Sequence, residues 1–248
     1  MRAEQVLGAP VSQRSQIVNR KSKMKIAVVG CGAVGSYYGA RLCRAGQDVH
    51  FLLRSDYDVV RRSGVTVRSV EGDFHVQPRS ARLPEEIGAC DVVLVALKTT
   101  ANDQFPELLP PLVGPHTAVI TLQNGLGNTE QLARLFPPEQ VLGGLCFVCL
   151  NRLEPGVIRH SDYGLIVLGE FQRPAEPRTR ALAEQLQAAG VPCKITDNLA
   201  QAQWEKLVLT DARSQLALAP RPRSGCCGAD SRRSSALPAA EARCRPGP

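Results

Sequence analysis

A glycine-rich turn follows a short apolar run near the start of the chain. The run is Lys25-Ile26-Ala27-Val28-Val29, and the turn reads Gly30-Cys31-Gly32-Ala33-Val34-Gly35. A β-branched run before glycines at this spacing predicts a strand, a tight turn and a helix that bind a dinucleotide. The first glycine permits the bend, the second lets the pyrophosphate approach the backbone, and the third allows close packing of helix on strand. We therefore expect the six turn residues to bind cofactor phosphates at a helix N-terminus. Kinases share this spacing, but no HRD or DFG sequence follows.

Arg54 is the residue that distinguishes between the two nicotinamide cofactors. It follows the second expected strand, Val49–Leu53. NAD enzymes place an acidic residue there to bind the ribose 2′-hydroxyl, whereas an arginine accommodates a 2′-phosphate. Asp56 is close by, but it falls beyond the strand end. The alternative is a solvated surface arginine, and the spacing from the glycine turn favours NADPH as cofactor.

Two further polar residues follow expected strands. Lys98 comes directly after the apolar run Val92–Leu97, and Asn124 follows the next strand in Leu122-Gln123-Asn124-Gly125. Ligands of open α/β sheets bind beyond the carboxyl ends of the strands, so both residues are candidates for binding the cofactor. The alternatives are an ordinary strand-end lysine and a turn-forming Asn-Gly pair.

Lys206 is the candidate for acid–base chemistry. It lies beside Trp204 on a helix expected to begin at Asp197. A lysine at this position could be fully exposed and inert. A lysine that is partly removed from water could instead donate a proton to a ketone oxygen.

The whole chain alternates between strand-like and helix-like segments. The expected strands are Lys25–Val29, Val49–Leu53, Val65–Val70, Phe74–Gln77, Asp91–Ala96, Ala118–Leu122, Val141–Leu150, Val157–His160 and Leu165–Leu168. The expected helices are Ala33–Ala45, Asp56–Arg62, helical sequence up to Leu112, Asn128–Phe136, Ala175–Ala189 and the helix from Asp197. This alternation predicts an α/β fold with a Rossmann-type doubly wound, mostly parallel sheet. Turns expected at Pro155-Gly156 and Tyr163-Gly164 separate the last strands, which we expect to add antiparallel edges.

Charge is concentrated at the two ends of the chain. Residues 1–23 carry five Lys or Arg against one Glu, a net +4, and residues 207–248 carry seven Arg against three acids, again +4. The stretch between them has a net charge of −1, so a basic nucleic-acid-binding face is not indicated. No apolar run approaches the ~20 residues of a membrane span, so no membrane partner is expected.

The nine cysteines show no secreted-disulfide pattern, which favours a reducing compartment. Cys146-Phe147-Val148-Cys149 has the CxxC spacing, but neither a second pair nor a nearby His follows. We therefore favour buried strand cysteines over a zinc site, and we expect no metal. Residues 1–23 lack the apolar core of a secretory signal, so we expect a cytoplasmic protein. An organellar transit peptide is the weaker alternative.

Taken together, these motifs resemble the ketopantoate reductase (2-dehydropantoate 2-reductase) family. The matching stretches are MKIAVVGCGAVGSYYGARL, the strand ending at Arg54, VALK, LQNGLG, GVIRHSDYGLIVLGE and QWEKL. The resemblance implies NADPH-dependent reduction of 2-dehydropantoate, a 2-oxo acid, to (R)-pantoate, a step toward pantothenate and coenzyme A. It implies that Lys206 is the catalytic lysine, that Lys98 and Asn124 contact the cofactor, and that Asn124 and Lys206 bind substrate.

The resemblance covers about Met24 to Leu207, and beyond it the sequence departs from the family. The family continues with an Asn-bearing helix and a helical substrate domain, whereas Thr210 and Ser214 stand four and eight residues after Lys206. We expect a disordered leader at 1–23, the NADPH-binding domain at 24–196, a truncated start of the helical domain at 197–219 and a disordered tail at 220–248. We expect that the chain diverges near Leu207 through a frameshift, an alternative exon or a faulty gene model. The alternatives to the reductase are a non-catalytic NADPH-binding fragment or pseudoenzyme, and a reductase of another 2-oxo acid.

Truncation also predicts an uncovered apolar surface. The helix from Asp197 would leave four side chains partly exposed, namely Leu199, Trp204, Leu207 and Val208. Exposed apolar patches promote association, so we expect a homodimer.

Overall fold

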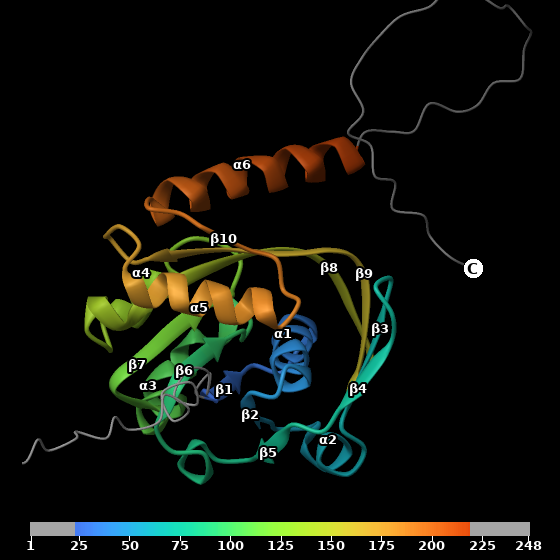
Figure 1. Cartoon of the computed structure of the whole chain (residues 1–248). Coiled ribbons are helices and arrows are strands. Elements are labelled where there is room, and N and C mark those ends of the chain that lie inside the picture. The colour runs from blue at the N-terminus through green and yellow to red at the C-terminus, as the bar shows by residue number, and fades with distance from the viewer. Residues whose placement is uncertain (1–22, 219–248) are drawn as a thin grey trace, which may run out of the picture.

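The computed structural model describes residues 23–218 (Figure 1). The strands are β1 (Lys25–Val29), β2 (Asp48–Leu52), β3 (Val65–Ser69), β4 (Phe74–Val76), β5 (Arg79–Ala81), β6 (Cys90–Val95), β7 (Val113–Thr121), β8 (Val141–Glu154), β9 (Val157–Glu170) and β10 (Cys193–Ile195). The α-helices are α1 (Ala33–Arg44), α2 (Tyr57–Ser63), α3 (Phe105–Leu108), α4 (Asn128–Ala133), α5 (Pro177–Ala188) and α6 (Leu199–Leu218). The expected leader and the tail from 220 onward lie outside the described residues, apart from Lys23.

One mixed sheet organises the described part of the chain. Its strand order is β4-β3-β9-β8-β7-β6-β1-β2-β5, and β10 pairs with β9. The run from β5 through β2, β1, β6 and β7 to β8 is parallel, whereas β8 and β9 pair antiparallel. The Rossmann-type, mostly parallel α/β fold is therefore confirmed.

Helices cover both faces of this sheet. Successive residues of β1 alternate between the faces, so Val28 belongs to one core cluster and Val29 to the other. The cluster around Val28 includes residues of α1 and α5, and the cluster around Val29 includes Phe105 of α3 and Leu132 of α4. This two-sided burial accounts for the nearly continuous apolar strands of the sequence.

Several expected boundaries differ from the structure. The turn expected at Tyr163-Gly164 is wrong, because β9 runs through both residues and pairs with β8 and β3. The stretch 99–112, expected to be helical, is mostly 3₁₀ turns around the four-residue helix α3. The three-residue strands β5 and β10 were not expected. Neither is long enough to leave an alternating pattern in the sequence.

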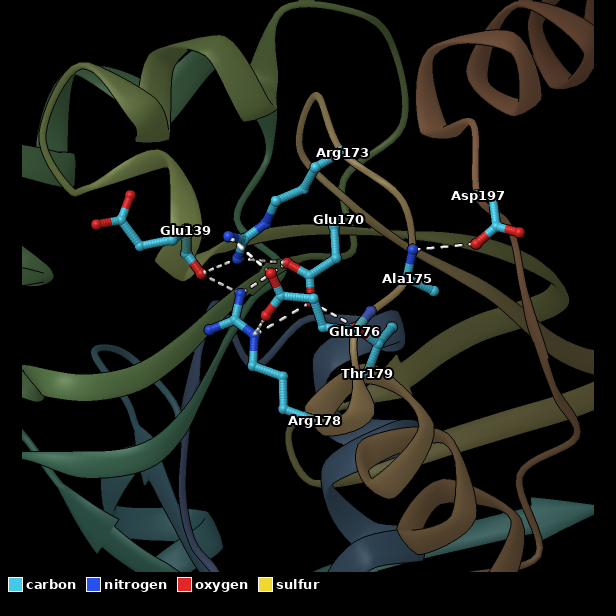
Figure 2. A network of polar contacts seen from close by, with 8 residues as sticks. All are labelled: Glu139, Glu170, Arg173, Ala175, Glu176, Arg178, Thr179 and Asp197. Atoms are coloured by element: carbon cyan, nitrogen blue, oxygen red, sulfur yellow. Dashed lines mark hydrogen bonds and ion pairs between the residues drawn. The ribbon is translucent and has the colours of Figure 1, made fainter.

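A buried carboxylate ties the end of β9 to the first turn of α5. Glu170 is fully buried and pairs with Arg178 at 2.6 Å and with Arg173 at 3.1 Å (Figure 2). Burial alone would raise the pKa of Glu170, but hydrogen bonds from Arg178 and Thr179 outweigh it and lower the pKa. The paired charge is thus compensated inside the protein.

The start of α6 is anchored by two contacts. Asp197 accepts a hydrogen bond from the backbone N–H of Ala175 at 3.0 Å (Figure 2). Leu199 is 4% exposed and fills the space beside Gly143 and Gly169, where an added Cβ would lie 2.8 Å from a neighbouring side chain. The expectation that Leu199 is uncovered is therefore wrong.

Three apolar side chains further along α6 are exposed. In Figure 1 this helix lies along one side of the molecule, next to β8 and β9. Trp204, Leu207 and Val208 are 59%, 40% and 65% exposed, which confirms the uncovered surface expected for these three residues. No helix of residues 23–218 is long and apolar enough to cross a membrane.

Candidate active site

The strand register brings the candidate site residues to one edge of the sheet. Val29 of β1 pairs with Leu52 of β2 and with Val95 of β6, and Val95 pairs in turn with Thr121 of β7. These four residues form one row across the sheet. Gly30, Arg54, Lys98 and Asn124 all follow this row by one to three positions. Residues from four separate parts of the sequence therefore gather where α/β sheets bind ligands.

The glycine turn has the geometry that its sequence predicts. Gly30 has φ +98°, and a Cβ there would lie 2.4 Å from the backbone N of Leu97. A Cβ on Gly35 would lie 2.3 Å from the carbonyl oxygen of Gly30, so only glycine lets α1 pack this closely on the turn. Gly32 differs, because a Cβ there would meet no atom within 4 Å. The backbone at Gly32, where α1 begins, is therefore open to a phosphate group.

The other residues of the turn contribute packing. Cys31 is partly buried, and its Sγ lies 3.5 Å from the carbonyl oxygens of Val28 and Leu52. Burial raises the pKa of the Cys31 thiol well above its ordinary range, so the thiol stays protonated. Ala33 and Val34 form the first turn of α1, and Val34 packs against the core cluster.

Arg54 and Lys98 are exposed at this edge. Arg54 lies two residues beyond β2, next to the strand that leads into the glycine turn. Lys98 directly precedes the 3₁₀ turn Thr99–Gln104. Both positions agree with the strand-end locations that the sequence predicts, and both leave the charged groups available to a ligand.

Lys206 and Asn124 are in direct contact. Nζ of Lys206, on α6, donates a hydrogen bond to Oδ1 of Asn124 at 2.8 Å. The same Nζ lies 5.2 Å from the centre of the Phe147 ring on β8, within range of a cation–π contact. Burial lowers the pKa of Lys206 from its ordinary value, and only a weaker effect of Cys146 opposes this. A lysine with a lowered pKa is a better proton donor near neutral pH.

A cavity of about 700 Å³ adjoins this pair. Its lining includes Asn124, Leu126, Phe147, Leu165, Lys206 and Leu207. The walls are mostly apolar and present few polar groups, which is the usual composition of a small-molecule site. The glycine turn, Arg54 and Lys98 do not line this cavity; they extend along the sheet edge beside it. The sheet edge therefore has two parts. One holds the glycine turn with Arg54 and Lys98, and the other is the cavity that holds Lys206 and Asn124.

Three polar residues that sequence reasoning missed hold the Asn124 loop in place. Gln123 donates hydrogen bonds to the Leu97 carbonyl at 2.9 Å and to Asn102 at 2.8 Å. Asn102 bonds Asn128 at 2.9 Å, and the Asn128 amide donates to the Asn124 carbonyl at 3.1 Å. Asn128 is 3% exposed. Because these contacts join distant segments, the sequence gives no local signal for them.

The CxxC cysteines lie beside this site. Cys146 is buried, as expected, and burial raises its pKa to about 12. Cys149 is only partly buried, so the expectation of two buried cysteines is half right. Both residues line the cavity. Within residues 23–218 no group of three or more His, Cys, Asp or Glu could hold a metal ion.

The fold and this sheet edge define the class of protein as a Rossmann-type α/β domain. Residues 26–173 match the family described as "Ketopantoate reductase PanE/ApbA". The chain belongs to the ketopantoate reductase family, as the resemblance in its motifs predicts.

Individual relatives agree with this assignment. A 2-dehydropantoate 2-reductase of Nostoc sp. is 43% identical over 193 residues, which are 75% of this chain and 60% of the relative. An uncharacterized oxidoreductase of Bacillus subtilis, YkpB, is 33% identical over 77% of this chain and 63% of its own length. The crystal structure of a 2-dehydropantoate 2-reductase from Geobacter metallireducens GS-15 is 52% identical and superposes with a TM-score of 0.73. That match covers 75% of this chain and 62% of the Geobacter chain. The chain thus spans about three fifths of the length of these relatives.

Proposed function

We propose that this chain carries the NADPH-binding part of a 2-dehydropantoate 2-reductase and catalyses NADPH-dependent reduction of 2-dehydropantoate to (R)-pantoate. The observation that carries the proposal is the 2.8 Å hydrogen bond from Lys206 to Asn124 beside a mostly apolar cavity. A proton donor and an amide next to a small-molecule cavity match the needs of ketone reduction. The names of the relatives at 43% and 52% identity support this choice of substrate.

The residues of the glycine turn fit a dinucleotide. The open backbone at Gly32 and the close packing at Gly35 leave room for a pyrophosphate at the start of α1. Arg54 would hold the 2′-phosphate, which favours NADPH over NADH, and Lys98 and Asn124 would contact the nicotinamide half. The cofactor supplies the hydride for the C2 ketone when it is bound.

Lys206 would perform the proton chemistry. Its ammonium group would hydrogen-bond the ketone oxygen, donate a proton to it and stabilise the negative charge that develops there. Asn124 would orient both Lys206 and the substrate through its side-chain amide. The lowered pKa of Lys206 supports this role, since the proton is released more readily than from an exposed lysine.

A non-catalytic NADPH-binding fragment is the second candidate. It is favoured by one observation, that the chain spans only about three fifths of its relatives' length. In this reading, the residues that bind substrate would lie in the two fifths of those relatives that this chain does not match. Reduction of another 2-oxo acid is a third candidate, because the cavity walls are mostly apolar and only Lys206 and Asn124 are assigned to substrate.

Two measurements on the 248-residue chain separate these candidates. NADPH binding is titrated by cofactor fluorescence, and NADPH consumption is followed with 2-dehydropantoate and with other 2-oxo acids. Turnover with 2-dehydropantoate supports the enzyme. Tight NADPH binding without turnover of any acid contradicts the enzyme and favours the fragment. Preferential turnover of a different acid supports the third candidate, a reductase of another 2-oxo acid.

A further inference from the structure

Tyr163 has an unusual backbone conformation inside a long strand. Its φ is +62°, one of two positive values among the non-glycine residues that the structure describes. Gly164 follows with φ +135°, and the pairing of β9 with β8 is irregular here, because Val148 faces Tyr163 whereas Phe147 faces Leu165. A bulky residue is costly in this left-handed region, and outliers of this kind cluster at functional sites.

Buried polar groups hold this irregularity in place. His160 is 1% exposed, and its Nε2 lies 2.8 Å from the Tyr163 carbonyl oxygen. A carbonyl only accepts, so Nε2 carries the hydrogen, and in the neutral ring Nδ1 accepts from the Ser69 hydroxyl at 2.8 Å. The Ser69 hydroxyl in turn accepts a hydrogen bond from the backbone N–H of Glu71 at 3.1 Å. A single chain of hydrogen bonds therefore runs from Glu71 through Ser69 and His160 to the Tyr163 carbonyl.

Helix α1 also contacts the irregular part of β9 around Tyr163. The Tyr38 hydroxyl donates to the Gly164 carbonyl at 3.3 Å, and the Tyr37 ring stacks on His160 with centroids 4.6 Å apart. Both tyrosines are almost fully buried. The helix that begins at the glycine turn therefore also fixes the backbone of Tyr163.

Tyr163 lines the cavity beside Lys206 and is 49% exposed. The register places Tyr163 across from Val148, one residue along β8 from Phe147, whose ring lies under the Lys206 ammonium group. Because Tyr163 and Lys206 line the same cavity, a 2-oxo acid bound by Lys206 would have the Tyr163 ring as part of the wall around it.

We propose that Tyr163 is a specificity-determining residue that limits the size of the 2-oxo acid bound beside Lys206, and that His160 is a positioning residue acting through it. This inference rests on the proposed function. Both residues lie in the stretch GVIRHSDYGLIVLGE, but the resemblance gives neither of them a role, and Tyr163-Gly164 has the composition of an ordinary turn.

The test uses the full chain saturated with NADP⁺ and measures calorimetrically the Kd of two acids, 2-dehydropantoate and the larger phenylpyruvate. Tyr163→Gly removes the ring and suits the backbone conformation, so the fold should be retained. We expect the ratio of the two Kd values to shift toward phenylpyruvate by about tenfold or more, as loss of a pocket wall typically gives. Gln172→Gly is the matched control, because Gln172 has φ +55° and does not line this cavity.

His160 is tested by a double-mutant cycle. We expect His160→Phe, which keeps an aromatic ring against Tyr37, to change the Kd ratio in the wild-type background but not in the Tyr163→Gly background. Ser69→Ala is the milder second variant if His160→Phe does not fold. A Kd ratio for Tyr163→Gly within twofold of wild type overturns the inference. If wild type binds NADP⁺ but neither acid, the proposed function itself fails, and the inference falls with it.

Discussion

The ammonium group of Lys206 and the amide oxygen of Asn124 meet at 2.8 Å, although 82 residues separate them in the chain. The contact joins α6 to the loop after β7, at the edge of the sheet where the glycine turn also lies. Its position depends on Asp197 and Leu199, which anchor the start of α6. The proposed chemistry therefore depends on how one helix docks onto the Rossmann-type sheet.

The glycines at positions 32 and 35 should respond differently to an added methyl group. Gly35→Ala places a Cβ 2.3 Å from the Gly30 carbonyl oxygen, so we expect a loss of stability of about 1–3 kcal/mol. Gly32→Ala meets no atom within 4 Å and should leave the melting temperature nearly unchanged. It should nevertheless weaken NADPH binding about tenfold or more, because the methyl group projects where the pyrophosphate would lie. Thermal melts and NADPH titrations check both variants, and equal effects on stability would contradict the assignment.

Arg54 should determine which nicotinamide cofactor is preferred. Arg54→Ala removes the partner proposed for the 2′-phosphate, so we expect NADPH affinity to fall about tenfold or more while NADH affinity changes little. The matched control is Arg79→Ala, another exposed arginine, which is outside the sheet edge that holds Gly30. Titration of both cofactors against both variants is the measurement. A parallel loss of NADH and NADPH affinity would argue against a role at the 2′-phosphate.

The pH dependence of turnover should follow Lys206. The protonated lysine is the proposed donor, so the rate is full below the pKa of Lys206 and declines as pH rises through it. Burial lowers this pKa from 10.5, which places the alkaline decline below pH 10.5. Phe147→Ala removes the cation–π contact but admits water beside Nζ. Because burial is the largest effect on this pKa, the decline should move to higher pH. A pH–rate profile of kcat for both proteins checks the shift, and an unchanged profile in the variant would contradict it.

The uncovered face of α6 should make the chain self-associate. Trp204, Leu207 and Val208 together expose an apolar surface, and a second copy of the chain could cover it. Trp204→Glu should weaken association by placing a charge in that contact. Light scattering across a concentration series measures the oligomeric state. Trp204 is the only tryptophan, so a blue shift of its emission with concentration reports its burial directly. A monomer at all concentrations with unshifted emission would exclude this contact.

Much of this architecture could be predicted from local sequence. The strand–turn–helix around Gly30 is specified by neighbouring residues, and the strand ends at Arg54, Lys98 and Asn124 share an edge because parallel strands point the same way. The path of β9 through Tyr163 could not be predicted, because pairing with β8 and β3 overrides a turn-like Tyr-Gly pair.

The contact between Lys206 and Asn124 depends on tertiary docking. The spacing of residues on α6 does not determine where that helix packs, so motifs alone left Lys206 as either an exposed or a partly buried lysine. Only the resemblance to a family placed both residues in one site. The amides of Asn102 and Asn128 that support Asn124 could not be predicted for the same reason, since they come from separate segments.

The most direct test of the central claim is formation of (R)-pantoate from 2-dehydropantoate and NADPH, compared between the 248-residue chain and its Lys206→Ala variant. We expect the wild-type chain to form (R)-pantoate and the variant to be slower by about 10²–10⁴-fold, the usual contribution of a positioned proton donor. NADPH affinity should stay within a few-fold, and Lys194→Ala, an exposed lysine on β10, should behave as wild type. Equal rates for wild type and Lys206→Ala, or no (R)-pantoate from the wild-type chain despite bound NADPH, would contradict the account.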